Sequence, residues 1–117
     1  MAKTDNDTNS TMIVTTTDDI AGYTVTETLG QVYGLVVRSR GIGGNFVASL
    51  RTIIGGEITE YTEMLEDARR HALDRMVKNA TAMGADAVIH MLFDSSEIGQ
   101  NMSEIVAYGT AVKIQKK

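Results

Sequence analysis

Two imidazole side chains are the only strong nitrogen ligands in this chain, and no thiol accompanies them. The histidines are His71 and His90, and the sequence contains no cysteine. Structural zinc sites take four Cys, His or carboxylate ligands, and soft metals favour sulfur ligands. Neither histidine has a second histidine or a pair of carboxylates at ligand spacing in its own segment. The two are therefore weak metal candidates, no cofactor is evident, and we expect any metal to bind weakly or between chains.

Each histidine also has a structural explanation, which the spacing favours. His71 follows Asp67 by four residues, so on a helix the two side chains would form an exposed ion pair. His90 stands between Val88 and Leu92 in an apolar segment and is expected to be a buried or interface residue with a hydrogen bond. A metal site that takes one His90 from each subunit around a symmetry axis remains the alternative.

Methionine thioethers are a second potential set of metal ligands, since the chain has seven methionines. Met64, Met76 and Met83 recur on one stripe of a helical segment, and Met91 lies in an apolar segment typical of a strand. Methionine at such positions usually fills a core. We therefore interpret these residues as packing residues rather than as a copper(I) site.

Charged and aromatic residues gather in the sequence around a glycine pair and could line a ligand pocket between subunits. A helix N-terminus in this region would favour an anionic group. The favoured alternative is that the arginines pair with carboxylates within an interface. No serine or threonine stands in a recognised nucleophile turn, so an enzyme with a site near the Gly55-Gly56 loop is only an alternative. The candidate ligand-binding residues are Arg51, Gly55, Gly56, Glu57, Tyr61 and Arg69.

Composition limits the classes of protein to consider. The 117 residues suit one domain, which we place at residues 12–117 after a disordered polar tail at residues 1–11. The formal net charge of −4 does not favour a nucleic-acid partner. No apolar run is long enough to span a membrane and no secretory signal is visible, so we expect a cytoplasmic protein.

One long amphipathic helix is predicted over residues 59–83. Apolar side chains recur there at intervals of three and four, and Gly84 suits the left-handed residue that follows a helix. A second, short helix is expected in the glycine-bracketed segment 41–56, where an apolar stripe would pack at a subunit boundary.

Strands are predicted at residues 24–37, 87–94 and 103–114, with a shorter strand at 12–16. The last two long strands would form a hairpin with a connection of about eight residues. All three long strands are apolar on both faces over part of their length. A single helix covers one face of a sheet, so the other face is expected to be covered by another copy of the chain.

Several short motifs follow one another in a fixed order: Ile54-Gly55-Gly56, Tyr61, the run from Met83 to Val88, Gly99-Gln100-Asn101 and Gly109-Thr110-Ala111-Val112. Taken in this order, they resemble the YbjQ-like family, which carries the label "putative heavy-metal-binding". The resemblance runs from about Met12 to Lys113. It implies an α+β subunit with a long helix on an antiparallel sheet, of the dodecin-like sort, assembled into a ring that is expected to be a homopentamer.

These observations together predict a ring-forming binding or scaffolding protein rather than an enzyme. The principal partner would be the chain itself, with a small ligand or a metal ion as a further partner. Two alternatives remain: a carrier of a small ligand in pockets between subunits, and an enzyme with a site near the Gly55-Gly56 loop.

Overall fold

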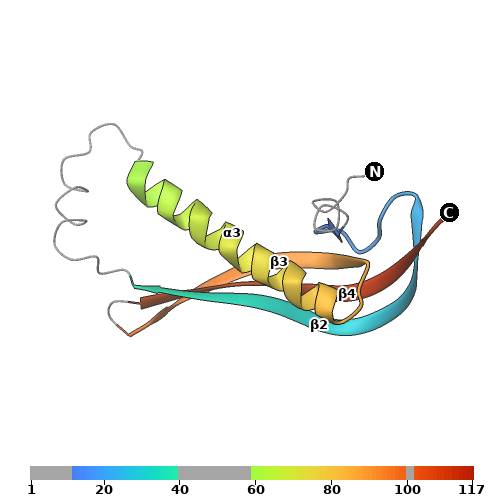
Figure 1. The fold of residues 1–117 in the computed structure, drawn as a ribbon. Coiled ribbons are helices and arrows are strands. Elements are labelled where there is room, and N and C mark those ends of the chain that lie inside the picture. Colours follow the sequence, from blue (N-terminus) through green and yellow to red (C-terminus); the bar gives the residue numbers. More distant parts are fainter. Residues whose placement is uncertain (1–11, 40–58, 100–101) are drawn as a thin grey trace, which may run out of the picture.

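The computed structural model describes residues 12–39, 59–99 and 102–117 (Figure 1). The predicted polar tail at residues 1–11 and the predicted short helix at 41–56 lie outside the described residues. Within the described part, the chain forms one helix and four strands: β1 (Ile13–Val14), β2 (Tyr23–Ser39), α3 (Thr59–Ala82), β3 (Ala87–Ile98) and β4 (Met102–Lys116). Their arrangement confirms the predicted α+β class.

The four strands form one mixed sheet in the order β1-β3-β4-β2. Strand β4 is antiparallel to both neighbours, but β1 runs parallel to β3, pairing Ile13 with Ala87 and Val14 with Val88. The prediction of a wholly antiparallel sheet is therefore wrong at the β1 edge. A two-residue strand has no pattern from which its direction could be predicted. In the structure, Val14 packs against the core under α3 and Ile13 packs against the cluster on the opposite face of the sheet.

The hairpin of β3 and β4 is longer than the sequence predicted. The strands continue to Ile98 and begin again at Met102, so the connection is much shorter than eight residues. Polar side chains hid these strand ends, because residues such as Ser96 suggest a loop. Ser96 lies opposite Glu104 in the ladder, and its hydroxyl donates a hydrogen bond to Glu104 Oε1 at 3.1 Å. Backbone pairing continues here although the side chains are exposed.

Helix α3 ends as its sequence predicts. Gly84 has a φ of 86°, the left-handed conformation that glycine adopts without a Cβ clash. The N–H of Ala85 donates to Ala80 O at 3.1 Å, and the N–H of Gly84 donates to Thr81 O at 3.0 Å. This pair of hydrogen bonds is a Schellman motif. The described helix is not sufficiently long and apolar to cross a membrane.

The main core lies between α3 and one face of the sheet (Figure 1). Small residues on the helix allow the two layers to approach closely, and a Cβ built on Gly34 of β2 would lie 2.3 Å from Ala72 O and from Met76 N. Met76 is fully buried at the centre of this contact. The core residues of α3 are Ala68, Ala72, Met76 and Ala80, and those of the sheet are Val32, Val36, Val88, Ile105, Ala107 and Ala111.

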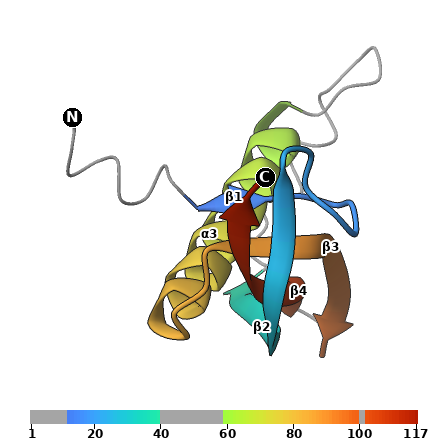
Figure 2. The ribbon, with the colours of Figure 1, turned by 90° about the vertical axis from the view of Figure 1, so that its right-hand side faces the viewer.

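A second, smaller cluster lies on the opposite face of the sheet, which we call the helix-free face. Ala87 and Val112 pair across β3 and β4, and they alternate with Val88 and Ala111, which belong to the helix side. Residues Ile13 and Ile20 pack against this cluster. The segment before β2 therefore covers one end of the helix-free face (Figure 2).

Candidate functional site

Most of the ligand-binding residues predicted around the glycine pair cannot be compared with the structure. Arg51, Gly55, Gly56 and Glu57 lie outside the described residues, and Tyr61 belongs to α3 without a described side chain. That site remains a prediction.

Arg69 is the one member of this set whose surroundings are described. Its guanidinium carbon lies 5.1 Å from the centre of the Phe93 ring, within the range of a cation–π interaction. The two residues line a shallow depression of about 360 Å³ together with Glu66, Arg70 and Leu73. The arginine thus contacts an aromatic ring of β3. Its predicted pairing with a carboxylate within an interface stays a prediction.

His71 lies on the exposed surface of α3 beside Asp67, as predicted. Its Nδ1 is 3.8 Å from Asp67 Oδ2. Arg38 of β2 adds a contact that the sequence did not predict: its Nη2 donates to Asp67 Oδ2 at 3.1 Å and also to His71 Nδ1. Because a guanidinium can only donate hydrogen bonds, it occupies the lone pair of Nδ1. This arrangement ties α3 to β2 and does not favour a cation at that nitrogen.

His90 is exposed in the described chain. Of the two placements predicted for it, burial within one subunit is wrong, and a position at an interface stays a prediction. The alternation of β3 breaks at this point, because the register with β4 shifts between Ile89 and Leu92. His90 has a φ of 56°, an unusual conformation for a residue other than glycine. The segment before β2 holds the distortion in place: His90 N–H donates to Thr17 O at 3.0 Å, and Met91 N–H donates to Thr15 O at 2.9 Å.

His90 lines an open surface depression of about 530 Å³, which we call the His90 cavity. Three strands build it. Tyr108 and Thr110 of β4 alternate with helix-side residues and so belong to the helix-free face. Its lining residues are Gly30, Gln31, His90, Leu92, Tyr108, Gly109 and Thr110. Sequence reasoning missed this cavity because the bulge that turns His90 outward has no marker such as glycine or proline.

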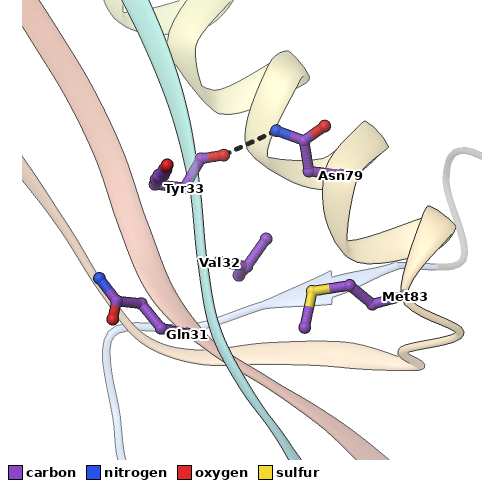
Figure 3. A pocket seen from close by; sticks show the side chains of 5 residues that line it. All are labelled: Gln31, Val32, Tyr33, Asn79 and Met83. Atoms are coloured by element: carbon purple, nitrogen blue, oxygen red, sulfur yellow. Dashed lines mark hydrogen bonds between the residues drawn. The ribbon is translucent and has the colours of Figure 1, made fainter.

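Another cavity, of about 380 Å³, lies where the C-terminal half of α3 meets the outer edge of β2 (Figure 3). Asn79 reaches across it, and its Nδ2 donates to Tyr33 O at 2.8 Å. One turn earlier, Arg75 Nη1 donates to Leu35 O at 2.7 Å. The contacts satisfy outward-facing carbonyls of an edge strand. No acid or base lines this cavity, and its polar contacts serve the packing of helix on strand.

The helix-free face carries most of the exposed large apolar side chains of the described residues. Eight large apolar side chains of the described residues are exposed. Strand alternation places six of them on the helix-free face. Several are about half exposed, for example Tyr33 at 53% and Leu92 at 54%. The six are Tyr33, Leu35, Val37, Leu92, Ile98 and Met102; the other two are Leu65 and Met83.

No set of three or more His, Cys, Asp or Glu side chains within the described residues is grouped so that it could hold a metal ion. The donor chemistry agrees with this geometry, since the sequence has no cysteine and its two histidines lie on different elements. The donors of one described chain therefore do not fit a tetrahedral site for zinc or a thiolate site for a soft metal.

Comparison with known proteins finds a family model described as "Putative heavy-metal-binding", which matches residues 12–115. A UPF0145 protein of Bradyrhizobium sp. strain ORS 278 is 69% identical over 104 residues, which are 89% of this chain and 94% of the relative. A UPF0145 protein of Methanocella arvoryzae is 59% identical over 104 residues, covering 89% and 87%.

A solved structure shares the fold at much lower identity. A crystal structure from Pediococcus pentosaceus, of a protein with unknown function assigned to the DUF74 family, matches with a TM-score of 0.60 and 18% identity. The match covers 89% of this chain and 98% of that chain. At this identity the likeness supports the fold alone.

Proposed function

We propose, for a chain that belongs to the YbjQ family of "Putative heavy-metal-binding" proteins, a role as a self-assembling binding protein. Its assembly would bury the helix-free face of one copy against another copy. The observation that carries this proposal is the row of exposed apolar side chains on that face.

These side chains lie beside one another on neighbouring strands. Tyr33 pairs with Tyr108, and Leu35 pairs with Val106, so apolar groups of β2 and β4 stand directly opposite each other. Leu92 of β3 pairs with Tyr108 from the other side. On the same face Asp94, Ser96 and Glu104 separate this patch from Ile98 and Met102 at the end of the hairpin. An apolar patch of this kind is typical of interfaces between proteins, whereas isolated exposed apolar side chains are common on any surface.

We expect the assembly to be a ring of dodecin-like subunits, and a homopentamer is the order implied by the family resemblance. The apolar row extends from β2 on one side of β4 to Leu92 of β3 on the other, and a ring would set this row of one copy against a different patch of the next copy. A contact between unlike patches of successive copies closes into a ring when the rotation between copies is a whole fraction of a turn.

The family description raises heavy-metal binding, but the donors described in one chain do not fit such a site. A metal held by the described residues would need ligands from more than one copy. His90 supports this more than His71 does, because the imidazole of His90 lies on the helix-free face whereas that of His71 contacts Arg38. The alternative with an active site near the Gly55-Gly56 loop falls outside the described residues.

Sedimentation equilibrium of the full chain at micromolar concentration tests the proposal. We expect a mass several times that of the single 12.7 kDa chain. Leu35→Asp should reduce the mass towards that of one chain, because an unpaired carboxylate is costly in a desolvated contact. Gln115→Asp is the matched control, since it adds the same charge at an exposed strand residue away from the apolar row.

Circular dichroism of both variants shows whether the subunit fold is retained. A wild-type chain that sediments as a monomer would overturn the proposal. So would a folded Leu35→Asp variant that keeps the wild-type mass.

A further inference from the structure

We propose that the helix-free face of one copy docks on the α3–β3 depression of the next copy, so that Asp94 and Glu104 of the first meet Arg69 and Arg70 of the second. The docking rests on the self-assembly proposed above, and the depression is the surface that receives the apolar row. Two observations carry this inference: the helix-free face holds carboxylates without a described cation, and the depression holds arginines beside apolar side chains. The α3–β3 depression is the shallow one of about 360 Å³ that Glu66, Arg69, Arg70, Leu73 and Phe93 line.

Asp94 and Glu104 form an acidic pair within the helix-free face. Asp94 lies opposite Val106 in the ladder and Glu104 lies opposite Ser96, so the two carboxylates are diagonal neighbours on one face. Asp94 Oδ1 accepts a hydrogen bond from the N–H of Ser95 at 2.9 Å, and Glu104 Oε1 accepts one from the Ser96 hydroxyl at 3.1 Å. Among the described residues, no lysine or arginine lies within ion-pair distance of either carboxylate.

The acidic pair limits which surface can cover the helix-free face. Leu92 lies on one side of the pair, and Ile98 and Met102 lie on the other, and all three are exposed in the single chain. A partner that covers both apolar parts also removes water from the carboxylates between them. Because a desolvated carboxylate without a cation is costly, the partner surface needs positive charge beside apolar side chains.

The α3–β3 depression supplies the apolar side chains. Helix α3 crosses the sheet at an angle, and its N-terminal half lies away from the sheet (Figure 1). Val88 is the one buried residue that β3 contributes to the core under α3, whereas Phe93 further along the strand is only partly buried. Leu73 of α3 is also partly buried. The helix therefore leaves apolar surface open on both walls of the depression.

The same depression supplies the positive charge. The guanidinium carbon of Arg69 lies 5.1 Å from the centre of the Phe93 ring, which holds the charge against the aromatic wall. The side chain of Arg70 is 65% exposed, and its Nη1 is 3.9 Å from Asp67 Oδ1, in a carboxylate that also accepts a hydrogen bond from Arg38. Glu66 offsets one charge, so the lining residues keep an excess of positive charge.

Other surfaces of the described chain fit the acidic pair less well. The cavity beside Asn79, the His90 cavity and a depression next to Thr81 contain no lysine or arginine among their lining residues. Contact of the helix-free face with itself would place two acidic pairs in one interface, and the described strand residues around each pair add no cation. Contact between two unlike surfaces can also close into a ring, because each copy repeats the same step.

Reversal of single charges tests the proposal, with sedimentation equilibrium of the full chain as the measurement. Arg70→Glu should raise the apparent dissociation constant of the assembly by about tenfold or more, because like charges would face each other across the contact. Asp94→Lys should have the same effect from the opposite surface. A chain with both changes should assemble more tightly than either single variant, because opposite charges again face each other.

Lys78→Glu is the matched control for the variant in α3. It makes the same change of charge at an exposed residue of the helix that does not line the depression, so it should keep the wild-type mass. Arg70 and Asp94 are also exposed, so we expect their variants to fold, and circular dichroism checks that they do.

Failure of the docking is distinguishable from failure of self-assembly. If Leu35→Asp dissociates the assembly while folded Arg70→Glu or folded Asp94→Lys keeps the wild-type mass, the helix-free face is an interface but the α3–β3 depression does not receive it. That result overturns the inference. It is equally overturned if the chain with both changes assembles no better than the weaker single variant. A wild-type chain that sediments as a monomer overturns the self-assembly, and the docking with it.

Discussion

At the scale of single residues, Gly34 of β2 and His90 of β3 differ in how the residue type suits its backbone position. Gly34 has no side chain because the backbone of α3 occupies the space where one would begin. His90 keeps a large side chain in a backbone conformation that suits glycine. The first position is explained by packing, whereas packing gives no reason for the second. This contrast is why His90 is the residue to examine for function.

Gly34→Ala should destabilise the fold by about 3 kcal/mol. The added Cβ would lie 2.3 Å from two backbone atoms of α3, which cannot move aside as a flexible side chain would. Urea unfolding measures the change, with Thr28→Ala as the control at an exposed position of the same strand. Equal stability of the two variants would show that α3 does not approach β2 this closely.

The sequence predicted the core residues better than the candidate site. Met76 was assigned to packing from its place on the helical stripe, and it is fully buried. His90 was assigned to a buried or interface position by the same kind of periodicity, and the bulge leaves it exposed in the single chain. A bulge depends on hydrogen bonds to a segment far away in the sequence, in this case Thr15 and Thr17. Local patterns do not contain that information.

At the scale of elements, the long helix was predictable because several independent signals agreed. The apolar stripe and the final glycine both pointed to the helix that the structure has at Thr59–Ala82. The strand ends were less predictable, since β3 and β4 continue through polar residues that pair by backbone alone. The direction of β1 was not predictable, because two residues define no pattern.

The edge of β2 gives a prediction at this scale. Asn79 Nδ2 donates to an outward-facing carbonyl of β2, and that contact fastens α3 to the strand. Asn79→Ala should reduce the free energy of unfolding by about 1 kcal/mol, the usual net contribution of such a hydrogen bond.

Lys78→Ala is the control for this variant, because Lys78 is the adjacent exposed residue of the same helix. Chemical denaturation of both variants provides the comparison. If Asn79→Ala costs no more than Lys78→Ala, the hydrogen bond contributes nothing measurable to helix–strand packing.

At the scale of the whole molecule, the described chain is covered on one side only. Helix α3 packs over one face of the sheet, and the segment before β2 covers just one end of the other (Figures 1 and 2). The sequence indicated this imbalance through strands that are apolar on both faces opposite a single long helix. It could not indicate which strand residues would remain exposed, because that depends on register.

Protection of a single engineered thiol tests most directly whether another copy covers the helix-free face. The sequence has no cysteine, so Leu35→Cys would introduce a unique reactive group in the apolar row, and Lys78→Cys would introduce one on the exposed side of α3. A thiol buried in an interface is out of reach of a water-soluble maleimide. We predict that Leu35→Cys reacts much more slowly than Lys78→Cys in the native protein, and equally fast once the protein is unfolded. Equal rates in the native protein would contradict the proposed assembly.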